Sequence, residues 1–460
     1  MTEQDLLDAA IEFHRAGRTL KAMTLFRRVL AFNPANHNAL RLYGTLLRQA
    51  GQPHPSIPLL ARAAALHPFV PVFHQDLQKS YAAIGRADLA SASYCRALIA
   101  EIRAGLDGLP PPHPLGWPGA RTPQMAVPRA ERAAPLHLFL NERWFLLDPR
   151  RGASNCMLYA ADGRAKTHPG TSAGFFPDEV ALHHGLPVDR AFERAIADLD
   201  PDVVVWSPQV NDLLTALDPR VETVAALKRR HGFKLVVTLY DMADAWGVEP
   251  ARPLVGLADL FVAMDLPPPL AAARLPDAPV LGMWAVADAD LFFDDGGDRD
   301  IPVSFVGQLR EARAAFLAQV QAAGLPVHRT GGQRSDAVLS YADYADVLRR
   351  SRMTINLPHS QTGGAPHVKA RVFEALSCGT LLLEQANPAT AHWLRPMEHY
   401  VPFDDAADLV AKARHYLEHP DQARAIAERG RDHVRANLDA KAFWRRLQAA
   451  ISGGSASISP

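Results

Sequence analysis

The segment from Val368 to Thr390, VKARVFEALSCGTLLLEQANPAT, places two cations and an acid on one predicted helix, residues 367–378. Arg371 and Glu374 are three positions apart and therefore share a side of that helix. A carboxylate at the inner end of the helix can accept hydrogen bonds from both hydroxyls of a ribose. Arg371, through its bidentate fork, or Lys369 can neutralise the charge of a diphosphate.

A second anion site is expected beyond the predicted strand Thr380–Glu384. There QANPATAHWL turns at Asn387–Pro388 and begins a new helix around Ala389–Thr390, whose free amides can bind a phosphate. An acid, cations and a helix start together suit a nucleoside diphosphate. The alternative is an ordinary amphipathic helix, whose Arg371–Glu374 pair is a solvated contact worth ~0.3 kcal/mol. The local chemistry favours neither interpretation.

Other strand ends carry related signals. In FVGQLREAR, Gly307 follows a predicted strand and precedes a helix that carries Arg310 and Arg313. The glycine lets a ligand approach the backbone, and the helix start favours an anion, although many such turns use glycine for geometry alone.

The loop MTINLPHSQTGGAPH ends a further strand with Asn356 and His359 and then reaches the pair Gly363–Gly364. It could move over a substrate or be a plain surface connection. His359 and His367 are candidates for contacts to a sugar or a leaving group, and equally ordinary loop histidines.

These positions require parallel sheets with helices on both faces, because near-continuous apolar strands alternate with helical runs from residue 136 onward. We predict two series of strands: 202–206, 234–241, 260–265 and 279–284, then 301–307, 326–331, 353–358, 380–385 and 399–403. Helices are expected at about 309–323, 341–351, 367–378 and 389–394. The fold class is thus α/β, with two doubly wound Rossmann-like domains that face a cleft, behind an all-α N-terminal part. Ligands of such sheets bind beyond the carboxyl ends of the strands.

The N-terminal hundred residues repeat with a period of 34, which Gly17, Gly51 and Gly85 mark. Small and large residues keep the same phase: Ala22, Ser56 and Ala90; Phe26, Leu60 and Tyr94; Val29, Ala63 and Ala97. The pattern looks like the tetratricopeptide repeat over about three units. The resemblance implies a short α-solenoid that binds a peptide or a protein partner, or that packs on the rest of the chain.

Proline-rich residues 105–135, with eight prolines, are expected to form an extended connector. The predicted boundaries are 1–104 for the helical repeats, 105–135 for the linker, 136–295 for the first wound domain, 296–452 for the second, and 453–460 for a flexible tail.

Composition narrows the class of protein. Lys plus Arg and Asp plus Glu both number 49, so the balanced charge gives no overall attraction to nucleic acid. The three cysteines, Cys95, Cys156 and Cys378, are too few for a disulfide framework or a four-thiolate zinc site. The N-terminus lacks signal-peptide character and no apolar run is long enough to span a bilayer, so a cytoplasmic location without a transmembrane segment is expected.

The segment VKARVFEALSCGTLLLEQ, preceded by FVGQLREAR and YADYADVLRRSRMTINL, resembles the nucleotide-sugar-binding half of GT-B glycosyltransferases of the spore-maturation type, related to families 1 and 4. The resemblance covers about residues 300–450, and VVTLYDMAD is similar to the acceptor half. It implies that Glu374 binds the ribose, that Gly307 and Arg371 lie near the phosphates, and that Asn387 and Thr390 belong to a loop facing the pyrophosphate.

The sequence departs from the family 4 pattern at Pro366, where the partner acid eight residues before Glu374 is expected. The acidic group that touches the transferred sugar is therefore missing or supplied elsewhere. This departure leaves the stereochemical outcome open, but it does not remove nucleotide binding.

If a donor binds, an acceptor hydroxyl displaces a nucleoside diphosphate, and Arg313, Lys369, Arg371 and the Thr390 helix start stabilise the leaving phosphates. No metal or other cofactor is then required. Asp288 and Asp290 resemble a metal-binding acidic pair of the other glycosyltransferase fold, but their place in the connector favours a solvated turn. Asp241, at a strand end, is the general-base candidate for an inverting reaction, and a strand-terminal Asp is also a common helix cap.

Two functions therefore remain open. The first is a glycosyltransferase that uses a UDP- or GDP-linked sugar as co-substrate and whose repeats recruit a protein or glycan acceptor or a partner. The second is a non-catalytic interaction protein with a degenerate sugar-nucleotide domain. The departure at Pro366 slightly favours the second, whereas Arg371, Glu374 and the loops suited to anions favour the first more.

Overall fold

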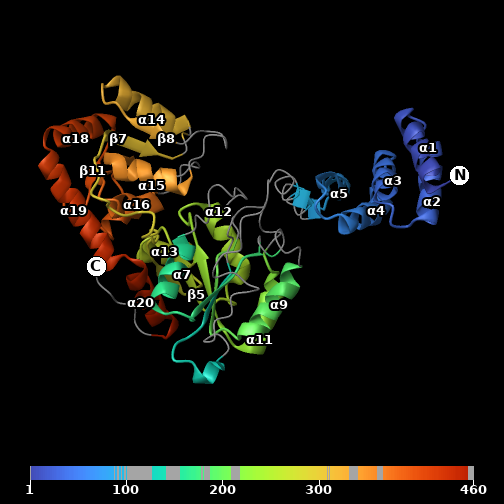
Figure 1. Cartoon of the computed structure of the whole chain (residues 1–460), viewed down its shortest axis with the longest axis horizontal. Helices are drawn as coiled ribbons and strands as arrows, with labels where there is room; N and C mark the ends of the chain where they lie inside the picture. Colours follow the sequence, from blue (N-terminus) through green and yellow to red (C-terminus); the bar gives the residue numbers. More distant parts are fainter. Residues whose placement is uncertain are drawn as a thin grey trace. The chain divides into compact units, whose positions relative to one another are not determined.

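The computed structural model describes residues 2–86, 127–140, 156–177, 187–208, 218–307, 311–330, 340–359 and 366–453. It also describes the single positions 89, 90, 93, 94, 96, 97, 100, 180 and 309. The chain divides into two compact units, and helices α1–α5 belong to the first and both sheets to the second. Figure 1 shows the course of the chain by colour, from the blue N-terminal helices to the red C-terminal ones. Arg310 and the pair Gly363–Gly364 lie outside the described residues.

In the described part of the first unit, consecutive helices pack against one another: α1 (Glu3–Arg15), α2 (Thr19–Phe32), α3 (His37–Gln49), α4 (Pro53–Leu66) and α5 (Pro71–Ala83). The predicted all-helical N-terminus is thereby confirmed. Gly17, Gly51 and Gly85 adopt left-handed φ values of +70°, +75° and +74°. Their shared conformation explains the 34-residue period, because each glycine allows the same turn after the first helix of a unit.

Small residues let the helices of this unit approach closely. Ala22 and Ser56 are fully buried, and a β-carbon on Gly44 would lie 2.8 Å from Cγ of Leu60. Phe26 and Leu60, the large residues of one repeat phase, are fully buried, whereas Tyr94, at the equivalent place in the third repeat, is 46% exposed. The phase is thus an interior one in two repeats and not in the third.

The first sheet is entirely parallel and has the strand order β2-β1-β3-β4-β5-β6. Its strands are β1 (His137–Leu140), β2 (Ser172–Phe175), β3 (Val203–Trp206), β4 (Lys234–Leu239), β5 (Leu260–Ala263) and β6 (Val280–Gly282). Its helices are α7 (Cys156–Thr167), α9 (Val188–Leu199), α11 (Val221–His231), α12 (Ala245–Val248) and α13 (Pro268–Arg274), with 3-10 turns η2 (Arg129–Glu131) and η4 (Glu249–Leu254).

The second sheet is also parallel, with the order β11-β10-β9-β7-β8. Its strands are β7 (Ile301–Val306), β8 (His328–Thr330), β9 (Ser351–Asn356), β10 (Leu381–Gln385) and β11 (Val401–Phe403). Its helices are α14 (Glu311–Ala322), α15 (Tyr341–Arg350), α16 (Ala370–Ser377), α17 (Pro388–Ala391), α18 (Ala406–Glu418), α19 (Pro420–Asn437) and α20 (Ala440–Ile451). The strand order reverses between β7 and β9, so a ligand site is expected beyond the carboxyl ends of these two strands.

Alternate residues of the central strands face opposite cores, as parallel sheets covered on both faces require. In β3, Val203 and Val205 face the core shared with the second sheet, and Val204 and Trp206 face α9 and α11. The two predicted wound domains are thus confirmed, each with an apolar layer on either side.

Helix α20 belongs by sequence to the predicted second domain, but it packs against α7 beneath the first sheet. Nε1 of Trp444 donates a hydrogen bond to the carbonyl oxygen of Ala160 at 2.5 Å, and the guanidinium of Arg164 lies over the indole. The predicted range 296–452 therefore ends in a helix that joins the other domain. None of the helices in the described part of the chain has both the length and the apolar character needed to cross a membrane.

Candidate functional site

The carboxyl ends of β7 and β9 bring Gly307, Asn356 and Arg371 together. Gly307 directly follows β7 with φ of +147°, a conformation that favours glycine. A β-carbon there would lie 2.6 Å from Nη2 of Arg371, so the guanidinium rests on the glycine backbone. The same guanidinium stacks over the ring of Phe305, 5.6 Å from its centroid. Gly307 thus allows the Arg371 guanidinium to lie close to its backbone.

Arg371 is held in place by a buried amide. Its Nη1 donates to Oδ1 of Asn356 at 2.9 Å, and Nδ2 of Asn356 donates to Oε2 of Glu384 at 2.7 Å. Asn356 and Glu384 are opposite each other in the register of β9 and β10, and both are fully buried. Burial raises the pKa of Glu384 to about 7, although hydrogen bonds from Asn356, Thr390 and Asn387 oppose this shift.

The loop after β10 is fixed by its own hydrogen bonds. Oδ1 of Asn387 accepts from the amide of Ala389, and the amides of Thr390 and Ala391 donate to the carbonyl oxygen of Asn387. Oγ1 of Thr390 donates to Oε1 of Glu384 at 2.9 Å. The helix-start amides that the sequence predicted to be free for a phosphate are therefore already paired, and Asn387 and Thr390 point to Glu384.

Glu374 and Arg371 have separate partners, contrary to the alternative of a solvated pair on an amphipathic helix. The hydroxyl of Tyr344, on α15, donates to Oε2 of Glu374 at 2.5 Å. Glu374 is only 7% exposed. Burial raises the pKa of its carboxyl, and the Tyr344 hydrogen bond and the Arg371 charge partly offset that effect. An acid held by one oxygen in this way can offer the other to a ligand.

Residues from both sheets meet at Asp241, which follows β4 with a left-handed φ of +52°. Nε2 of His367 lies 2.8 Å and Nζ of Lys369 3.3 Å from its Oδ1, and Lys369 also contacts the imidazole. Burial opposes ionisation of Asp241, but the His367 hydrogen bond and the Lys369 charge prevail and lower its pKa to about 2. Lys369, which was predicted on the helix, is instead the N-cap residue of α16.

Asp265, beyond β5, completes this cluster. It is 5% exposed, and among the described residues neither carboxylate oxygen has a hydrogen bond of good geometry, although the amides of Met242 and Asp265 lie near. Burial and the Asp241 charge raise the pKa of Asp265 to about 8. Ligand atoms of Asp241, Asp265 and His367 lie within 4.8 Å of one another, so these groups could hold a metal ion. The ammonium of Lys369 lies against two of them and supplies a positive charge there.

Arg313 lies beside these residues on α14. Its Nη2 donates to the carbonyl oxygen of His359 at 2.8 Å and lies 3.4 Å from that of Leu357. Burial lowers the pKa of Lys369, and the charge of Arg313 contributes to this shift, whereas Asp241 opposes it. The charge of Arg313 is thus felt at Lys369, on the same side of the site. The side chain of His359 is exposed on the same loop.

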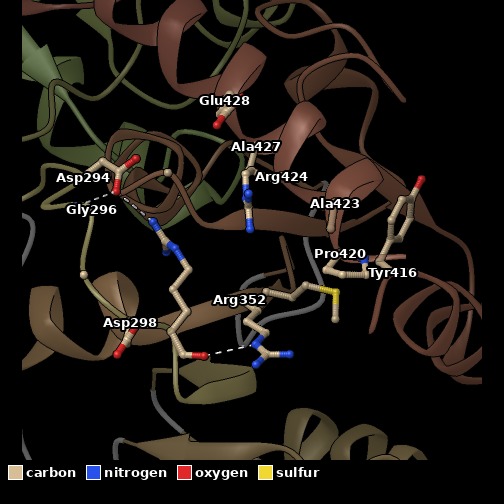
Figure 2. A pocket seen from close by; sticks show the side chains of 14 residues that line it. Asp294, Gly296, Asp298, Arg352, Tyr416, Pro420, Ala423, Arg424, Ala427 and Glu428 are labelled. Carbon is tan, nitrogen blue, oxygen red and sulfur yellow. Dashed lines mark hydrogen bonds and ion pairs between the residues drawn. The ribbon is translucent and has the colours of Figure 1, made fainter. Parts of the chain in front are cut away.

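A separate cavity of about 570 Å³ lies at the opposite, amino-terminal edge of the second sheet. Figure 2 shows Arg424 extending into it from α19, with Arg352 on the facing wall. The cations and acids that line it are equal in number: Arg299, Arg352, Arg424, Asp294, Asp298 and Glu428. This cavity contains none of the predicted site residues.

Sequence reasoning missed Glu384, Tyr344 and Asp265. Glu384 had one available signal, since it is the sole charged residue in the apolar strand LLLEQ. Asp265 ends the predicted strand LFVAMD, just as Asp241 ends KLVVTLYD, and this parallel could have identified it. For Tyr344 the sequence offered no signal, because its contact depends on the packing of α15 against α16.

Residues 305–449 match the family model described as "Glycosyl transferase-like". The match confirms the predicted resemblance for the C-terminal domain, and the two parallel sheets confirm the predicted fold class. Residues 305–449 are therefore similar to a glycosyltransferase domain, in a chain with two Rossmann-like sheets behind a helical N-terminus. No curated protein matches the chain.

Several solved structures are remotely similar. HepE of Anabaena in complex with UDP-glucose has 12% identity and a TM-score of 0.49, over 70% of this chain and 100% of that one. Sucrose-phosphate synthase of Thermosynechococcus elongatus has 16% identity and a TM-score of 0.43, over 57% of this chain and 77% of that one. A mutant O-GlcNAc transferase of Thermobaculum terrenum has 16% identity and a TM-score of 0.45, over 97% of this chain and 96% of that one.

Proposed function

We propose that this protein transfers a sugar from a UDP- or GDP-linked donor to a hydroxyl of a protein, glycan or cell-envelope acceptor. The observation that carries the proposal is the arrangement of Gly307, Arg371 and Glu374 beyond β7 and β9, within the segment that matches the glycosyltransferase model. A glycine, a guanidinium and a half-satisfied carboxylate at the point where the strand order reverses suit a nucleoside diphosphate.

In this proposal Glu374 accepts the ribose hydroxyls with the oxygen that Tyr344 leaves open. The diphosphate lies along Gly307 and is neutralised by Arg313, Lys369 and Arg371. The Arg371 charge is held in place by Asn356 and stabilises the leaving phosphates without reorganisation, whereas Lys369 moves to the phosphates when the donor binds. No metal ion is required for that step. Asn387 and Thr390 act through Glu384, since their polar atoms are already paired within the loop.

The acceptor oxygen forms the new bond to the anomeric carbon as the bond to the diphosphate breaks, and a base takes the hydroxyl proton. Asp241 is the proposed base, on the first-sheet side of the site, and His359 is proposed to contact the sugar or the leaving group. A carboxylate with a pKa of about 2 is a weak base while Lys369 and His367 hold it. Donor phosphates attract Lys369, and its departure from Asp241 raises the basicity of that carboxylate.

The N-terminal helices are proposed to recruit the acceptor or a protein partner, and the cytoplasm is the proposed location. The competing proposal, an interaction protein with a degenerate sugar-nucleotide domain, draws on Pro366 in place of the second acid. The hydrogen bonds from Arg371 through Asn356 to Glu384 favour a working donor site, because a buried carboxylate and amide beneath the arginine keep its guanidinium in place.

Release of free nucleoside diphosphate from a panel of sugar nucleotides tests the proposal. A thermal-shift panel of UDP, GDP, dTDP and ADP provides the binding arm. A nucleotide at 100 times its Kd should stabilise the fold by ~2.7 kcal/mol. Binding without release on any acceptor supports the degenerate alternative, and absence of both contradicts the donor site.

A further inference from the structure

Glu384 is a fully buried carboxylate that contacts two segments of the site at once. We propose that Glu384 is a positioning residue, which orients the Arg371 guanidinium through Asn356 and anchors the loop 387–390 with its other oxygen. The inference rests on the proposed function, in which Arg371 neutralises the donor diphosphate.

The position of Glu384 follows from the strand register. In β10, Leu381 and Leu383 face the core formed with α14 and α18, whereas Leu382 faces the opposite core. Glu384 therefore shares the face of Leu382, and its register partner in β9 is Asn356. The last pair on this face is polar, and it lies at the strand ends that lead to Gly307 and Arg371.

The Asn356 side-chain amide links the orientation of the Arg371 guanidinium to Glu384, because its two ends differ in polarity. A guanidinium has only donors, so Arg371 requires the carbonyl end of the amide, and the NH2 end must then face an acceptor. Oε2 of Glu384 is that acceptor at 2.7 Å, and Arg371 reaches Oδ1 at 2.9 Å. A donor at position 384 would favour the flipped amide, whose NH2 group would face the guanidinium.

The second oxygen of Glu384 fixes the loop after β10. Oε1 accepts from Oγ1 of Thr390 at 2.9 Å and from Nδ2 of Asn387 at 3.5 Å. Nδ2 of Asn387 also donates to the carbonyl oxygen of His367 at 3.3 Å, in the segment that leads to Lys369. The Glu384 carboxylate thus contacts Asn356, which holds Arg371, and Asn387, which contacts the segment before Lys369. The proposed function places both of these cations on the diphosphate.

An exchange of partners tests this role. In Glu384→Gln the negative acceptor is lost, and in Asn356→Asp two carboxylates face each other. In the double variant, the new carboxylate at position 356 accepts from Arg371 and from the new side-chain amide at position 384. The oxygen of that amide accepts from Thr390. Arg371 still donates to position 356, the hydrogen bond between positions 356 and 384 is reversed, and the net charge of the pair is unchanged.

The probe is whichever of UDP, GDP, dTDP and ADP stabilises the wild-type chain most, and its Kd is measured by calorimetry. Each single variant should raise Kd about 10-fold, and the double variant should return to within about 3-fold of wild type, as expected for coupled neighbours. Thr380→Ala is the control. Thr380 is equally buried, bonds to the carbonyl oxygen of Leu348, and precedes the same strand at the opposite edge, so its variant should lower Tm without changing Kd.

A Kd for Glu384→Gln within about 2-fold of wild type would overturn the inference, as would a double variant that binds as weakly as Asn356→Asp. A purely structural Glu384 would change Tm in all three variants and leave Kd at the wild-type value. A wild-type chain that binds none of the four nucleotides contradicts the donor site itself, and this outcome is distinct from the other two.

Discussion

The Arg371 guanidinium lies on the backbone of Gly307, at a place where a β-carbon would come within 2.6 Å of Nη2. The position of the Arg371 guanidinium therefore depends on the absence of a side chain at position 307. Any residue other than glycine must displace the guanidinium and also adopt a φ of +147°.

Gly307→Ala is therefore expected to weaken nucleoside diphosphate binding more than 10-fold and to cost ~1–3 kcal/mol of stability through backbone strain. Calorimetry and thermal unfolding measure the two effects. Gly256→Ala is the matched control, since Gly256 has a φ of +84° with open space around its Cα. The control should lose stability and keep its affinity, and an equal loss of affinity in both variants would contradict the placement of the phosphates.

Glu374→Ala is expected to abolish most nucleotide affinity, because a carboxylate that accepts the ribose hydroxyls is lost. It also leaves the hydroxyl of the half-buried Tyr344 without its acceptor, which costs ~1 kcal/mol. The double variant Glu374→Ala/Tyr344→Phe removes both partners and should recover much of the Tm while affinity stays low. Affinity that recovered together with Tm would show that the single variant acted through the fold.

Asp241→Asn and Lys369→Met should separate binding from turnover. Asp241→Asn removes the proposed base and frees Lys369 for phosphate, so kcat should fall about 100-fold or more while nucleotide affinity holds or improves. Lys369→Met should weaken affinity. Steady-state kinetics and calorimetry on both variants give the comparison, and a weaker affinity in Asp241→Asn would argue against competition for the ammonium.

The raised pKa of Asp265 predicts a pH-dependent stability. The pKa of this carboxyl is about 8 in the folded chain and 3.8 ordinarily. The contribution of the protonated carboxyl to the free energy of unfolding is therefore complete below pH 3.8 and is lost as pH rises through 8. Asp265→Asn resembles the protonated form and should gain Tm relative to wild type between pH 5 and about pH 9, most at the alkaline end. The exposed control Asp277→Asn should follow wild type at every pH. Parallel curves for all three proteins would disprove the buried, protonated Asp265.

Chelation tests the expectation that the transfer needs no metal. Dialysis against EDTA should leave Tm, nucleotide affinity and turnover unchanged, because the ammonium of Lys369 supplies the positive charge at Asp241, Asp265 and His367. A loss of turnover that Mn²⁺ or Zn²⁺ restores would instead assign a metal to those three residues.

The sequence predicted the sheets well because their strands are apolar on both faces and lie between clear helical runs. All nine predicted strands are present within a few residues, and the two strands before them, β1 and β2, were not resolved from the pattern. The residues on strand ends, Gly307, Asn356 and Asp241, were found for the same reason, since position after a strand is visible in the sequence.

The partners of those residues could not be read in the same way. The contact between Tyr344 and Glu374 depends on how far α15 is shifted along α16 where the two helices pack. The relay from Arg371 to Glu384 requires the register of β9 against β10, and the Lys369 contact with Asp241 joins residues 128 positions apart. Local spacing placed Arg371 beside Glu374, but tertiary packing gave each of them a different partner.

The return of α20 to α7 means that the polypeptide passes between the two sheet domains twice, once through the connector at residues 287–300 and again just before Ala440. Two separate connections restrict the relative motion of two domains more than a single connection does. The final helix, far from the reacting atoms, thereby restricts how the two sheets can move apart, and cutting the chain at Asp439 would leave a looser joint with an intact donor site.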